Sequence, residues 1–338
     1  MATTVDSVVG SCRKVVGSRR KVVGVLWRLK NFVLNLPTEK NWDGSYLYQY
    51  QGFWCPSRHI HGTISFQRRF QAQDTDIILT SFPKSGTTWL KALTFTIVNR
   101  FRYELKDSPL LTTSPHDLLP VNQIQHSTHN QTPTLEEFPT PRIFATHIPY
   151  ASLPVSIVNS NCRIVYVCRN PLDQFISNWH FLLELREQTK EPISLDEAFE
   201  MICNGIQAFG PIWDHVLGYW KASAEKPHKI LFLKYEDLKV GINFYVKKLA
   251  DFLGCPFSKE EESRNVIEEI SKFCSFDNMK KLEVNKNGRL NDGIKTKVFF
   301  RKGLVGDHTN YLNSSMSERL DKILEEKLGG SGFTFKKP

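Results

Sequence analysis

Several common features are missing from this sequence, and each absence excludes a class of protein. No stretch approaches the roughly 20 apolar residues of a membrane span, and the N-terminus lacks the apolar core and cleavage site of a secretory signal. The seven cysteines are scattered and form no CxxC pair, so we expect reduced thiols in a cytoplasmic protein. His59 and His61 have no third ligand close by in the sequence, so we expect no metal site.

The positive charge of the chain is unevenly distributed. The net charge is +9, and residues 1–30 carry +6 of it, with seven basic side chains against the single acidic Asp6. We predict that residues 1–35 form a flexible basic tail ahead of one domain at 36–338; a transit peptide and a membrane-surface helix are the alternatives. The remainder suits an anionic ligand and has no basic stripe interleaved with aromatic residues. We therefore expect neither a nucleic acid nor a membrane as partner.

Short apolar runs alternate with helical patterns along the predicted domain. One helical pattern begins at Thr87, and another opens with Pro171, a favoured first-turn residue. Continuous apolar strands that alternate with helices are typical of a parallel sheet covered on both faces. The sequence therefore predicts an α/β fold in a single domain, with an open, doubly wound parallel sheet flanked by helices. The predicted strands are 76–82, 142–146, 163–168 and 230–233.

A chemically useful group follows each predicted strand. The first strand runs into the turn at 83–88, and the other three are followed by His147, Arg169 and Tyr235. Because open parallel sheets place their sites at the carboxyl ends of the strands, we expect these groups to share one site. Two polar segments, 121–141 and 283–297, are predicted to be loops, and long loops often cover or line binding sites.

The turn after the first strand has the chemistry of an anion cradle. Gly86 permits a sharp turn, the following helix start supplies unpaired amides, and Lys84 supplies a point charge. The alternative is an ordinary helix capped by Ser85 or Thr87 beside an exposed lysine, which accounts for one residue but not for the whole string. The string is not a Walker A motif, and that motif is found nowhere in the chain, which argues against an ATP-driven kinase or ATPase.

Three segments resemble the cytosolic sulfotransferase family. The string PKSGTTW at 83–89 resembles the family's 5′-phosphosulfate loop, which is P-loop-like in position. The string RIVYVCRNPLDQFISNWHF at 163–181 resembles its 3′-phosphate-binding strand and helix, and FFRKGLVGDH at 299–308 resembles its RKGxxGDW segment. The strings YLYQYQGFW at 46–54 and HKILFLKYEDLK at 228–239 are similar to the plant branch. The resemblance runs from about residue 40 to the end of the chain.

The resemblance implies a role for each matching residue. It implies 3′-phosphoadenosine 5′-phosphosulfate (PAPS) as the sulfate donor, no metal, and His147 as general base with Lys84 as a second catalytic residue. The implied contacts of the 5′-phosphosulfate are Lys84, Ser85, Gly86, Thr87 and Thr88. The implied contacts of the adenine are Trp89 and Tyr235, with Ser275 as a further candidate at the donor site. The implied contacts of the 3′-phosphate are Arg169, Ser177, Arg301, Lys302 and Gly303.

Each of these residues also has a structural interpretation. Arg169 could be an ion-pair partner, Ser177 a helix-surface serine, and Trp89 or Tyr235 part of the core. The doublet at 301–302 could be solvated charge. Their joint occurrence at strand ends and within motifs favours the functional interpretation.

The chain departs from the family pattern at three places. His308 replaces the usual tryptophan of the RKGxxGDW segment, so we expect looser packing of the loop after it. Ala145 stands where many animal members carry a lysine two residues before the catalytic histidine. The animal dimer motif KxxxTVxxxE is not matched, because Asn313 and Ser314 stand in place of its TV pair. We therefore expect a monomer.

The resemblance implies in-line transfer of a sulfuryl group from PAPS to the hydroxyl of a small acceptor. We expect a flavonoid or another phenolic of plant secondary metabolism as acceptor. A hydroxyjasmonate, a brassinosteroid or a desulfoglucosinolate is the alternative. Three other functions stay open: a nucleotide kinase, a Golgi-type carbohydrate sulfotransferase, which would need a membrane anchor, and a catalytically silent nucleotide-binding protein.

Overall fold

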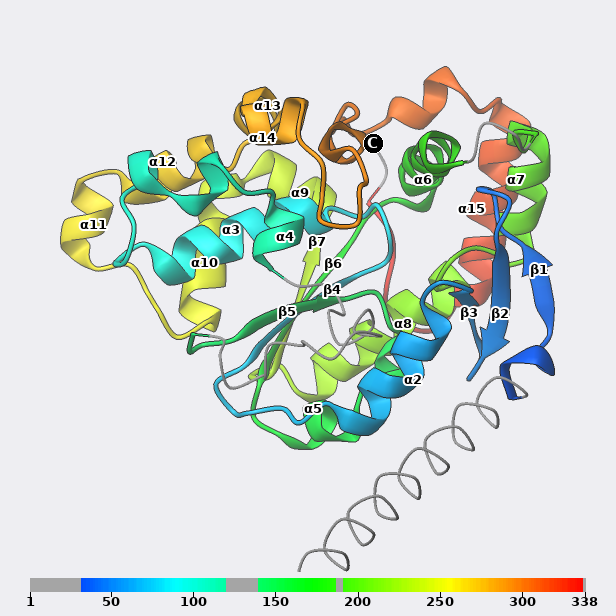
Figure 1. Cartoon of the computed structure of the whole chain (residues 1–338), viewed down its shortest axis with the longest axis horizontal. Helices are drawn as coiled ribbons and strands as arrows, with labels where there is room; N and C mark the ends of the chain where they lie inside the picture. The colour runs from blue at the N-terminus through cyan, green and yellow to red at the C-terminus, as the bar shows by residue number, and fades with distance from the viewer. Residues whose placement is uncertain (1–31, 120–138, 187–190, 337–338) are drawn as a thin grey trace, which may run out of the picture.

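The computed structural model describes residues 32–119, 139–186 and 191–336 (Figure 1). The predicted tail at 1–35 therefore lies almost wholly outside the described residues, as does most of the predicted loop at 121–141. Val33, near the end of the predicted tail, is buried in the core, and Phe32 packs edge-on against Tyr50. No helix among the described residues is long and apolar enough to cross a membrane.

A four-stranded parallel sheet forms the centre of the molecule, in the order β5-β4-β6-β7. The predicted strands are confirmed to within one residue at each end. Every residue of β4 is buried, as expected for a strand with helices on both faces. The four strands are β4 (Ile77–Ser81), β5 (Ile143–Thr146), β6 (Arg163–Cys168) and β7 (Ile230–Lys234).

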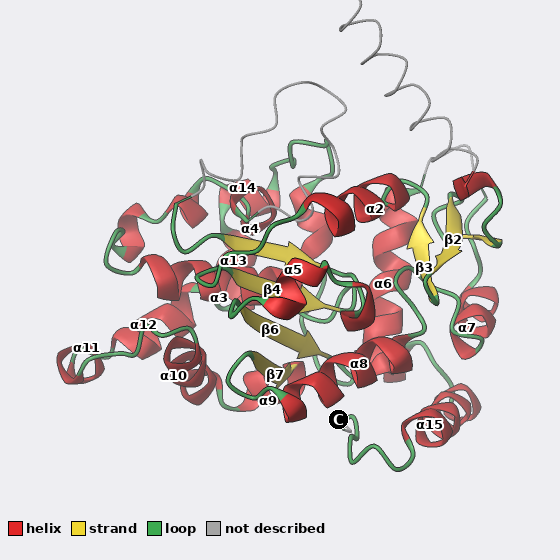
Figure 2. Cartoon of the chain, turned by 90° about the horizontal axis from the view of Figure 1, so that it is seen from below, coloured by secondary structure: helices red, strands yellow, loops and turns green. Residues whose placement is uncertain are grey.

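Successive residues of the strands face two separate cores, as the two-residue period of a strand requires. In β6, Ile164 and Tyr166 enter one core, and Val165 and Val167 enter the other. Figure 2 shows helices on both sides of the sheet. The helices of the first core are α2 (Ile60–Arg69), α5 (Val155–Asn159), α6 (Pro171–Leu185), α7 (Leu195–Cys203), α8 (Ile212–Glu225) and α15 (Ser314–Leu328). Those of the second are α3 (Thr87–Asn99), α9 (Tyr235–Val240), α10 (Ile242–Phe252), α12 (Val266–Phe273) and α13 (Phe276–Lys281).

A second, antiparallel sheet lies beside the first core, and the sequence did not predict it. Its strands are β1 (Thr38–Lys40), β2 (Tyr46–Tyr50) and β3 (Phe53–Pro56). Gln51 and Gly52 both have positive φ, which is the backbone of the tight turns that join antiparallel strands. Phe53 is buried and stacks on Phe209, so this aromatic residue belongs to the core.

The predicted loop at 283–297 is only partly irregular. It contains α14 (Glu283–Lys286), and its last residues open the short 3-10 helix η6 (Thr296–Phe299). The hydroxyl of Thr296 donates to the carbonyls of Val284 and Gly288, which closes the segment on itself. Two further short α-helices are α4 (Pro115–Leu118) and α11 (Lys259–Ser263).

Candidate functional site

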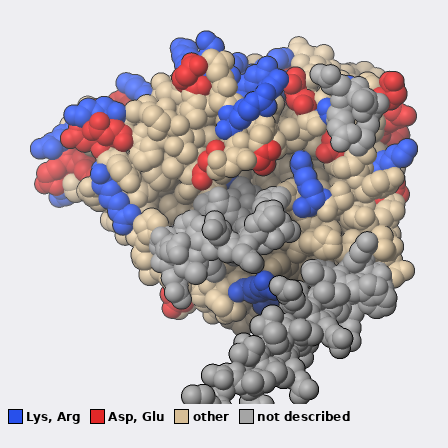
Figure 3. All heavy atoms as spheres, viewed as in Figure 1, with Lys and Arg blue, Asp and Glu red and all other residues tan. Residues whose placement is uncertain are grey.

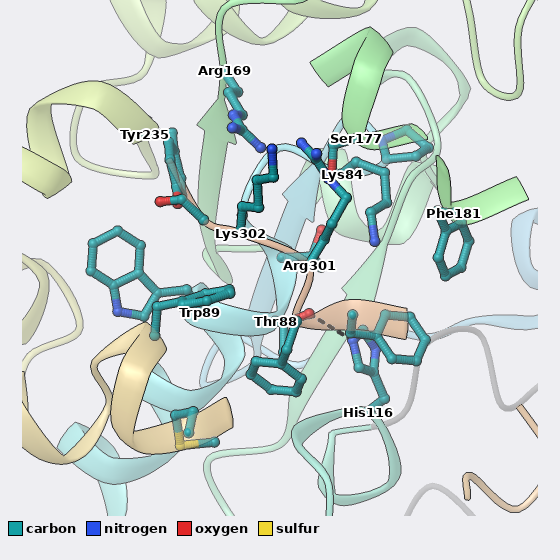
Figure 4. Close-up of a pocket in the computed structure, with 18 of the residues that line it drawn as sticks. Lys84, Thr88, Trp89, His116, Arg169, Ser177, Phe181, Tyr235, Arg301 and Lys302 are labelled. Atoms are coloured by element: carbon teal, nitrogen blue, oxygen red, sulfur yellow. Dashed lines mark hydrogen bonds between the residues drawn. The ribbon is translucent and has the colours of Figure 1, made fainter. Parts of the chain in front are cut away.

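The carboxyl ends of the parallel strands meet at one edge of the sheet, and a cavity opens there (Figure 4). Its empty volume, counting the open mouth, is about 940 Å³. The groups predicted after the four strands all line this cavity. The predicted residues that line it are Lys84, Gly86, Thr87, Thr88, Trp89, His147, Arg169, Ser177, Tyr235, Arg301, Lys302 and Gly303.

The turn between β4 and α3 has an unusual backbone. Lys84 has a φ of 66° and Gly86 a φ of 111°, so two residues of the turn occupy the left-handed region. A Cβ on residue 86 would lie 2.9 Å from Cδ2 of Tyr235. Glycine has no Cβ and avoids this clash. Gly86 is the N-cap of α3. The first amides of that helix have no partner within it and favour an anion at this point.

Neighbouring side chains hold this turn in place. The hydroxyls of Ser81 and Thr87 lie 2.6 Å apart, which ties the end of β4 to the start of α3. Nε2 of Gln174, in α6, donates to the carbonyl oxygen of Pro83 over 2.9 Å. The turn is therefore fixed from both sides before any ligand binds.

The side chain of Lys84 reaches into the cavity toward Phe181 (Figure 4). Its Nζ lies 4.0 Å from the centre of the Phe181 ring and 5.3 Å from that of Phe299. Burial lowers the pKa of Lys84 to about 7, and the positive charges of Arg169 and Arg301 add to this effect. An anion in the cavity would favour the protonated amine again.

His147 follows β5, and a main-chain oxygen orients its ring. Nδ1 lies 2.7 Å from the carbonyl oxygen of Ser81. Because a carbonyl oxygen can only accept, Nδ1 carries the proton and Nε2 keeps a free lone pair. Burial lowers the pKa of His147 to about 4, the hydrogen bond to Ser81 opposes the shift, and the charges of Lys91 and Lys84 add to it. His147 is therefore neutral near pH 7.

The main chain at His147 is anchored from the first core. Nε2 of His215 donates to the carbonyl oxygen of His147 over 2.9 Å. Nδ1 of the same ring lies 2.9 Å from the hydroxyl of Tyr166, which donates to it. The hydroxyl of Tyr219 donates to the carbonyl oxygen of Ile148 over 2.7 Å. Three buried side chains thus hold the main chain from which the His147 ring projects.

Arg169 and Tyr235 form one wall of the cavity. The guanidinium of Arg169 lies 4.7 Å from the centre of the Tyr235 ring, and its Nη2 donates to the carbonyl oxygen of Leu304 over 2.6 Å. Trp89 meets the same ring edge-on, with centres 5.6 Å apart. The hydroxyl of Tyr235 donates to the carbonyl oxygen of Gly303 over 2.9 Å. The wall therefore joins the turn after β6 and the start of α9 to the segment that contains Gly303.

The carboxylate of Asp307 forms ion pairs with the two basic side chains of that segment. It accepts from Nη1 of Arg301 over 2.6 Å and from Nζ of Lys302 over 2.8 Å. Desolvation alone would raise the pKa of Asp307, but these hydrogen bonds lower it to about 2. The carboxylate is therefore ionised near pH 7 and holds both cations, which line the cavity.

The expectation of a loose loop at His308 is wrong. His308 is 5 % exposed, and its Nδ1 lies 2.9 Å from a carboxylate oxygen of the fully buried Asp173, in α6. The same carboxylate accepts the amides of Gly306 and His308. Desolvation would raise the pKa of Asp173, but the hydrogen bond from His308 and the charge of Arg169 lower it. The imidazole thus ties the loop to α6.

Two predicted residues are not among those that line the cavity. Ser275 is the N-cap of α13, where its hydroxyl accepts the amide of Asn278, although its neighbours Cys274 and Phe276 do line the cavity. Ser85 is fully buried, and its hydroxyl has no hydrogen-bond partner among the described residues.

The sequence did not predict a second histidine in the cavity. His116, in α4, lines it, and its Nε2 lies 2.8 Å from Oγ1 of Thr88. Phe299 packs against the His116 ring, with centres 4.0 Å apart. A lone histidine in the string SPHDL carries no spacing signal, so only the fold reveals its place. Phe299 stands inside the quoted FFRKGLVGDH string, where it drew no attention.

The polar groups around the cavity fit a ligand with several negative charges. The buried nitrogens Trp89 Nε1, Arg169 Nε and Arg301 Nε have no hydrogen-bond partner in the described part of the chain. Buried donors are normally satisfied, so these three nitrogens are exceptions beside the basic side chains that line the cavity. Within residues 32–119, 139–186 and 191–336, no group of three or more His, Cys, Asp or Glu side chains is placed to hold a metal ion. On the face shown in Figure 3, basic and acidic side chains are interspersed.

Comparison with known proteins places this arrangement in a family. Residues 74–332 match the family model described as the sulfotransferase domain. Cytosolic sulfotransferase 15 of Arabidopsis thaliana is 46% identical over 306 residues, which cover 89% of this chain and 85% of the relative. A solved sulphotransferase structure from Arabidopsis thaliana is 38% identical, with a TM-score of 0.72 over 90% of this chain and 94% of that one. A mouse sulfotransferase solved with PAP is 26% identical, with a TM-score of 0.63 over 85% and 96% of the two chains.

Proposed function

Because this chain belongs to the plant cytosolic sulfotransferase family and is a PAPS-dependent enzyme, we propose that it sulfates a phenolic hydroxyl with His147 as the general base. PAPS supplies the sulfuryl group, and the phosphate of the nucleotide is the leaving group. The observation that carries the proposal is the free Nε2 lone pair of His147 in the same cavity as the Lys84 amine. The cytosol is the proposed location, since the relatives are named cytosolic, and we propose a monomer.

Each wall of the cavity offers groups that suit one part of PAPS. The turn at 83–88 and the start of α3 offer amides, hydroxyls and the Lys84 amine to the 5′-phosphosulfate. The rings of Trp89 and Tyr235 offer flat surfaces to the adenine. Arg169, Ser177 and the segment 301–303 offer donors and positive charge to the 3′-phosphate. Ser275 stays a candidate donor contact, because a hydroxyl that caps α13 accepts an amide and keeps its own proton.

His147 would take the proton of the acceptor hydroxyl on Nε2. As that proton leaves, the acceptor oxygen forms a bond to sulfur, and the bond between sulfur and the bridging oxygen of the donor breaks. The pKa of His147 near 4 makes it a weak base. A phenol, with a pKa of about 10, gives up its proton far more readily than an aliphatic alcohol. A phenolic acceptor therefore demands less of the base than an aliphatic alcohol does.

Lys84 would stabilise the negative charge that develops on the bridging oxygen. Its buried amine lies beside the rings of Phe181 and Phe299, whose centres are 5.4 Å apart, and little water competes there with an anion. Electrostatic stabilisation at a desolvated site carries much of the rate enhancement in related group transfers. Its neighbours Arg169 and Arg301 would be balanced by the phosphates of the donor.

The apolar surroundings of the two catalytic groups support an aromatic acceptor. Phe181 and Phe299 lie beside the Lys84 amine, and the ring centres of Phe209 and His147 are 5.5 Å apart. Flat aromatic rings pack well against such walls. We therefore propose a flavonoid or other phenolic first. A hydroxyjasmonate, a brassinosteroid or a desulfoglucosinolate is the alternative acceptor.

The test is transfer of radiolabelled sulfate from PAPS to a panel of these four compound classes. We expect phenolics to be labelled and His147→Ala to abolish labelling while PAP still binds. Labelling of an aliphatic alcohol alone would overturn the acceptor assignment. Labelling that survives His147→Ala would overturn the assignment of the base. Tight PAP binding without transfer to any acceptor would favour a silent nucleotide-binding protein.

A further inference from the structure

Lys91 is a cation in a place where proteins seldom put one. It lies in α3, its side chain is fully buried, and burial lowers its pKa to about 7. Nζ lies 3.1 Å from the carbonyl oxygen of Leu119 and 3.2 Å from Nδ1 of His116. A leucine or methionine would fill the same space without the cost of desolvating an amine. The polar contacts of Lys91 therefore call for an explanation beyond packing.

His116 connects Lys91 to the donor site. Its ring lies against Phe299, and its two nitrogens point in opposite directions, Nδ1 toward Lys91 and Nε2 toward Thr88. Figure 4 shows the bond between His116 and Thr88 at the floor of the cavity. Burial lowers the pKa of His116 well below its ordinary value, and the charges of Lys91, Lys84 and His147 add to this. The ring is therefore neutral, with one proton to place.

The order of the protons along this chain follows from the donors available. In its ammonium form Lys91 has three protons and no lone pair, so it donates to Nδ1 of His116. Nδ1 then accepts, and the single ring proton sits on Nε2, which donates to Oγ1 of Thr88. The hydroxyl proton of Thr88 is then available to another acceptor. Thr88 is the second residue of α3, so no earlier turn of this helix offers a carbonyl to that proton.

We propose that Lys91 and His116 are positioning residues that hold the Thr88 hydroxyl as a hydrogen-bond donor to the phosphosulfate group of PAPS. The inference rests on the proposed function in one respect, because it takes Thr88 to face the 5′ end of the donor. Neither positioning residue touches the reacting atoms in this arrangement. Each acts through the direction of one hydroxyl proton.

The test is a double-mutant cycle read on donor affinity. His116→Phe keeps a ring against Phe299 and removes both nitrogens, and Thr88→Val removes the hydroxyl at nearly constant shape. A hydrogen bond to a charged group contributes enough that His116→Phe should weaken PAPS binding about tenfold or more. In the Thr88→Val background the same change should cost less than about twofold, because the hydroxyl that it acts on is gone.

Two further variants separate positioning from a structural role. His116→Gln places an amide N–H near the position of Nε2 and should recover PAPS affinity to within about threefold of the wild type. Lys91→Met should weaken PAPS binding, and that loss should also vanish in the Thr88→Val background. Unfolding temperatures of all variants are recorded, and Lys91→Met and His116→Gln carry the test if His116→Phe does not fold.

Equal losses in both backgrounds would overturn the proposal, as would a glutamine variant as weak as the phenylalanine variant at an unchanged unfolding temperature. Affinities are measured without an acceptor. Failure of the acceptor or of His147 as base therefore leaves this cycle readable, whereas wild-type protein that does not bind PAPS would overturn the proposed function itself.

Discussion

Nδ1 of His147 and the carbonyl oxygen of Ser81 lie 2.7 Å apart, across two neighbouring strands of the parallel sheet. This contact decides which nitrogen carries the proton, and it leaves Nε2 as the acceptor inside the cavity. The relationship depends on the register of β4 and β5, in which Thr80 pairs with Thr146. Ser81 and His147 each come one residue after this pair, so the carbonyl of Ser81 and the ring of His147 lie side by side.

Loss of the His147 side chain should abolish most of the activity without loss of donor binding. General base catalysis contributes about 10²- to 10⁴-fold, so His147→Ala should lower kcat by that factor while the Kd for PAP stays near the wild-type value. His61, exposed on α2, is the matched control, and His61→Ala should leave kcat unchanged. Equal losses in both variants would contradict the role of His147.

The activity should persist to lower pH than an ordinary histidine allows. Burial lowers the pKa of His147 to about 4, so its Nε2 is protonated, and the base lost, only as the pH falls through about 4. We expect kcat/KM to be flat between about pH 6 and pH 8 as far as this group is concerned. The measurement is a pH profile with a phenolic acceptor, corrected for unfolding. An acidic limb with a midpoint near 6.5 would contradict the prediction.

Binding of PAP should be accompanied by proton uptake at pH 8. The pKa of Lys84 is lowered to about 7 by burial and by two neighbouring arginines, so the amine is largely neutral at pH 8 in the free protein. The phosphate of the ligand favours the ammonium and raises that pKa, which draws up to about one proton from solution. Calorimetric titrations in buffers of different ionisation enthalpy measure this uptake. No uptake at pH 8 would contradict the prediction.

The lowered pKa of Lys84 and that of Lys91 also predict the pH dependence of stability. In both cases the unfolded chain binds more protons than the folded one between about pH 7 and 10.5. The stability of the free protein should therefore gain from these two groups as the pH rises through that window. Chemical unfolding of the wild type and of Lys91→Met at pH 7 and pH 9 tests this. The gain should be smaller in the variant.

An alanine at Gly86 should damage the donor site through a clash as well as backbone strain. The added Cβ would lie 2.9 Å from the Tyr235 ring at a φ of 111°. Gly52 is the matched control, because its φ is 84° but nothing lies within 4 Å of the added Cβ. Each variant should lose about 1–3 kcal/mol of unfolding free energy through strain. Only Gly86→Ala should also weaken PAP binding, by tenfold or more by calorimetry.

Much of the architecture could be predicted from local pattern. The apolar runs at 76–82, 142–146, 163–168 and 230–233 predicted the parallel strands, because strands buried on both faces must be apolar throughout. The antiparallel strands β1 to β3 were missed. β1 is entirely exposed, β2 mixes exposed and buried residues, and β3 has only four residues, so no long apolar run marks them.

The sequence by itself determined the parallel sheet, the turn at 83–89 and the chemical types of the residues at the strand ends, because these depend on contiguous residues and on their periodicity. The tertiary structure alone decided the rest. It put His116 against Thr88, buried His308 on Asp173, and lowered the pKa of Lys84 and His147. Hydrogen bonds and desolvation depend on groups brought together from distant parts of the chain, and no local pattern in one sequence encodes those distances.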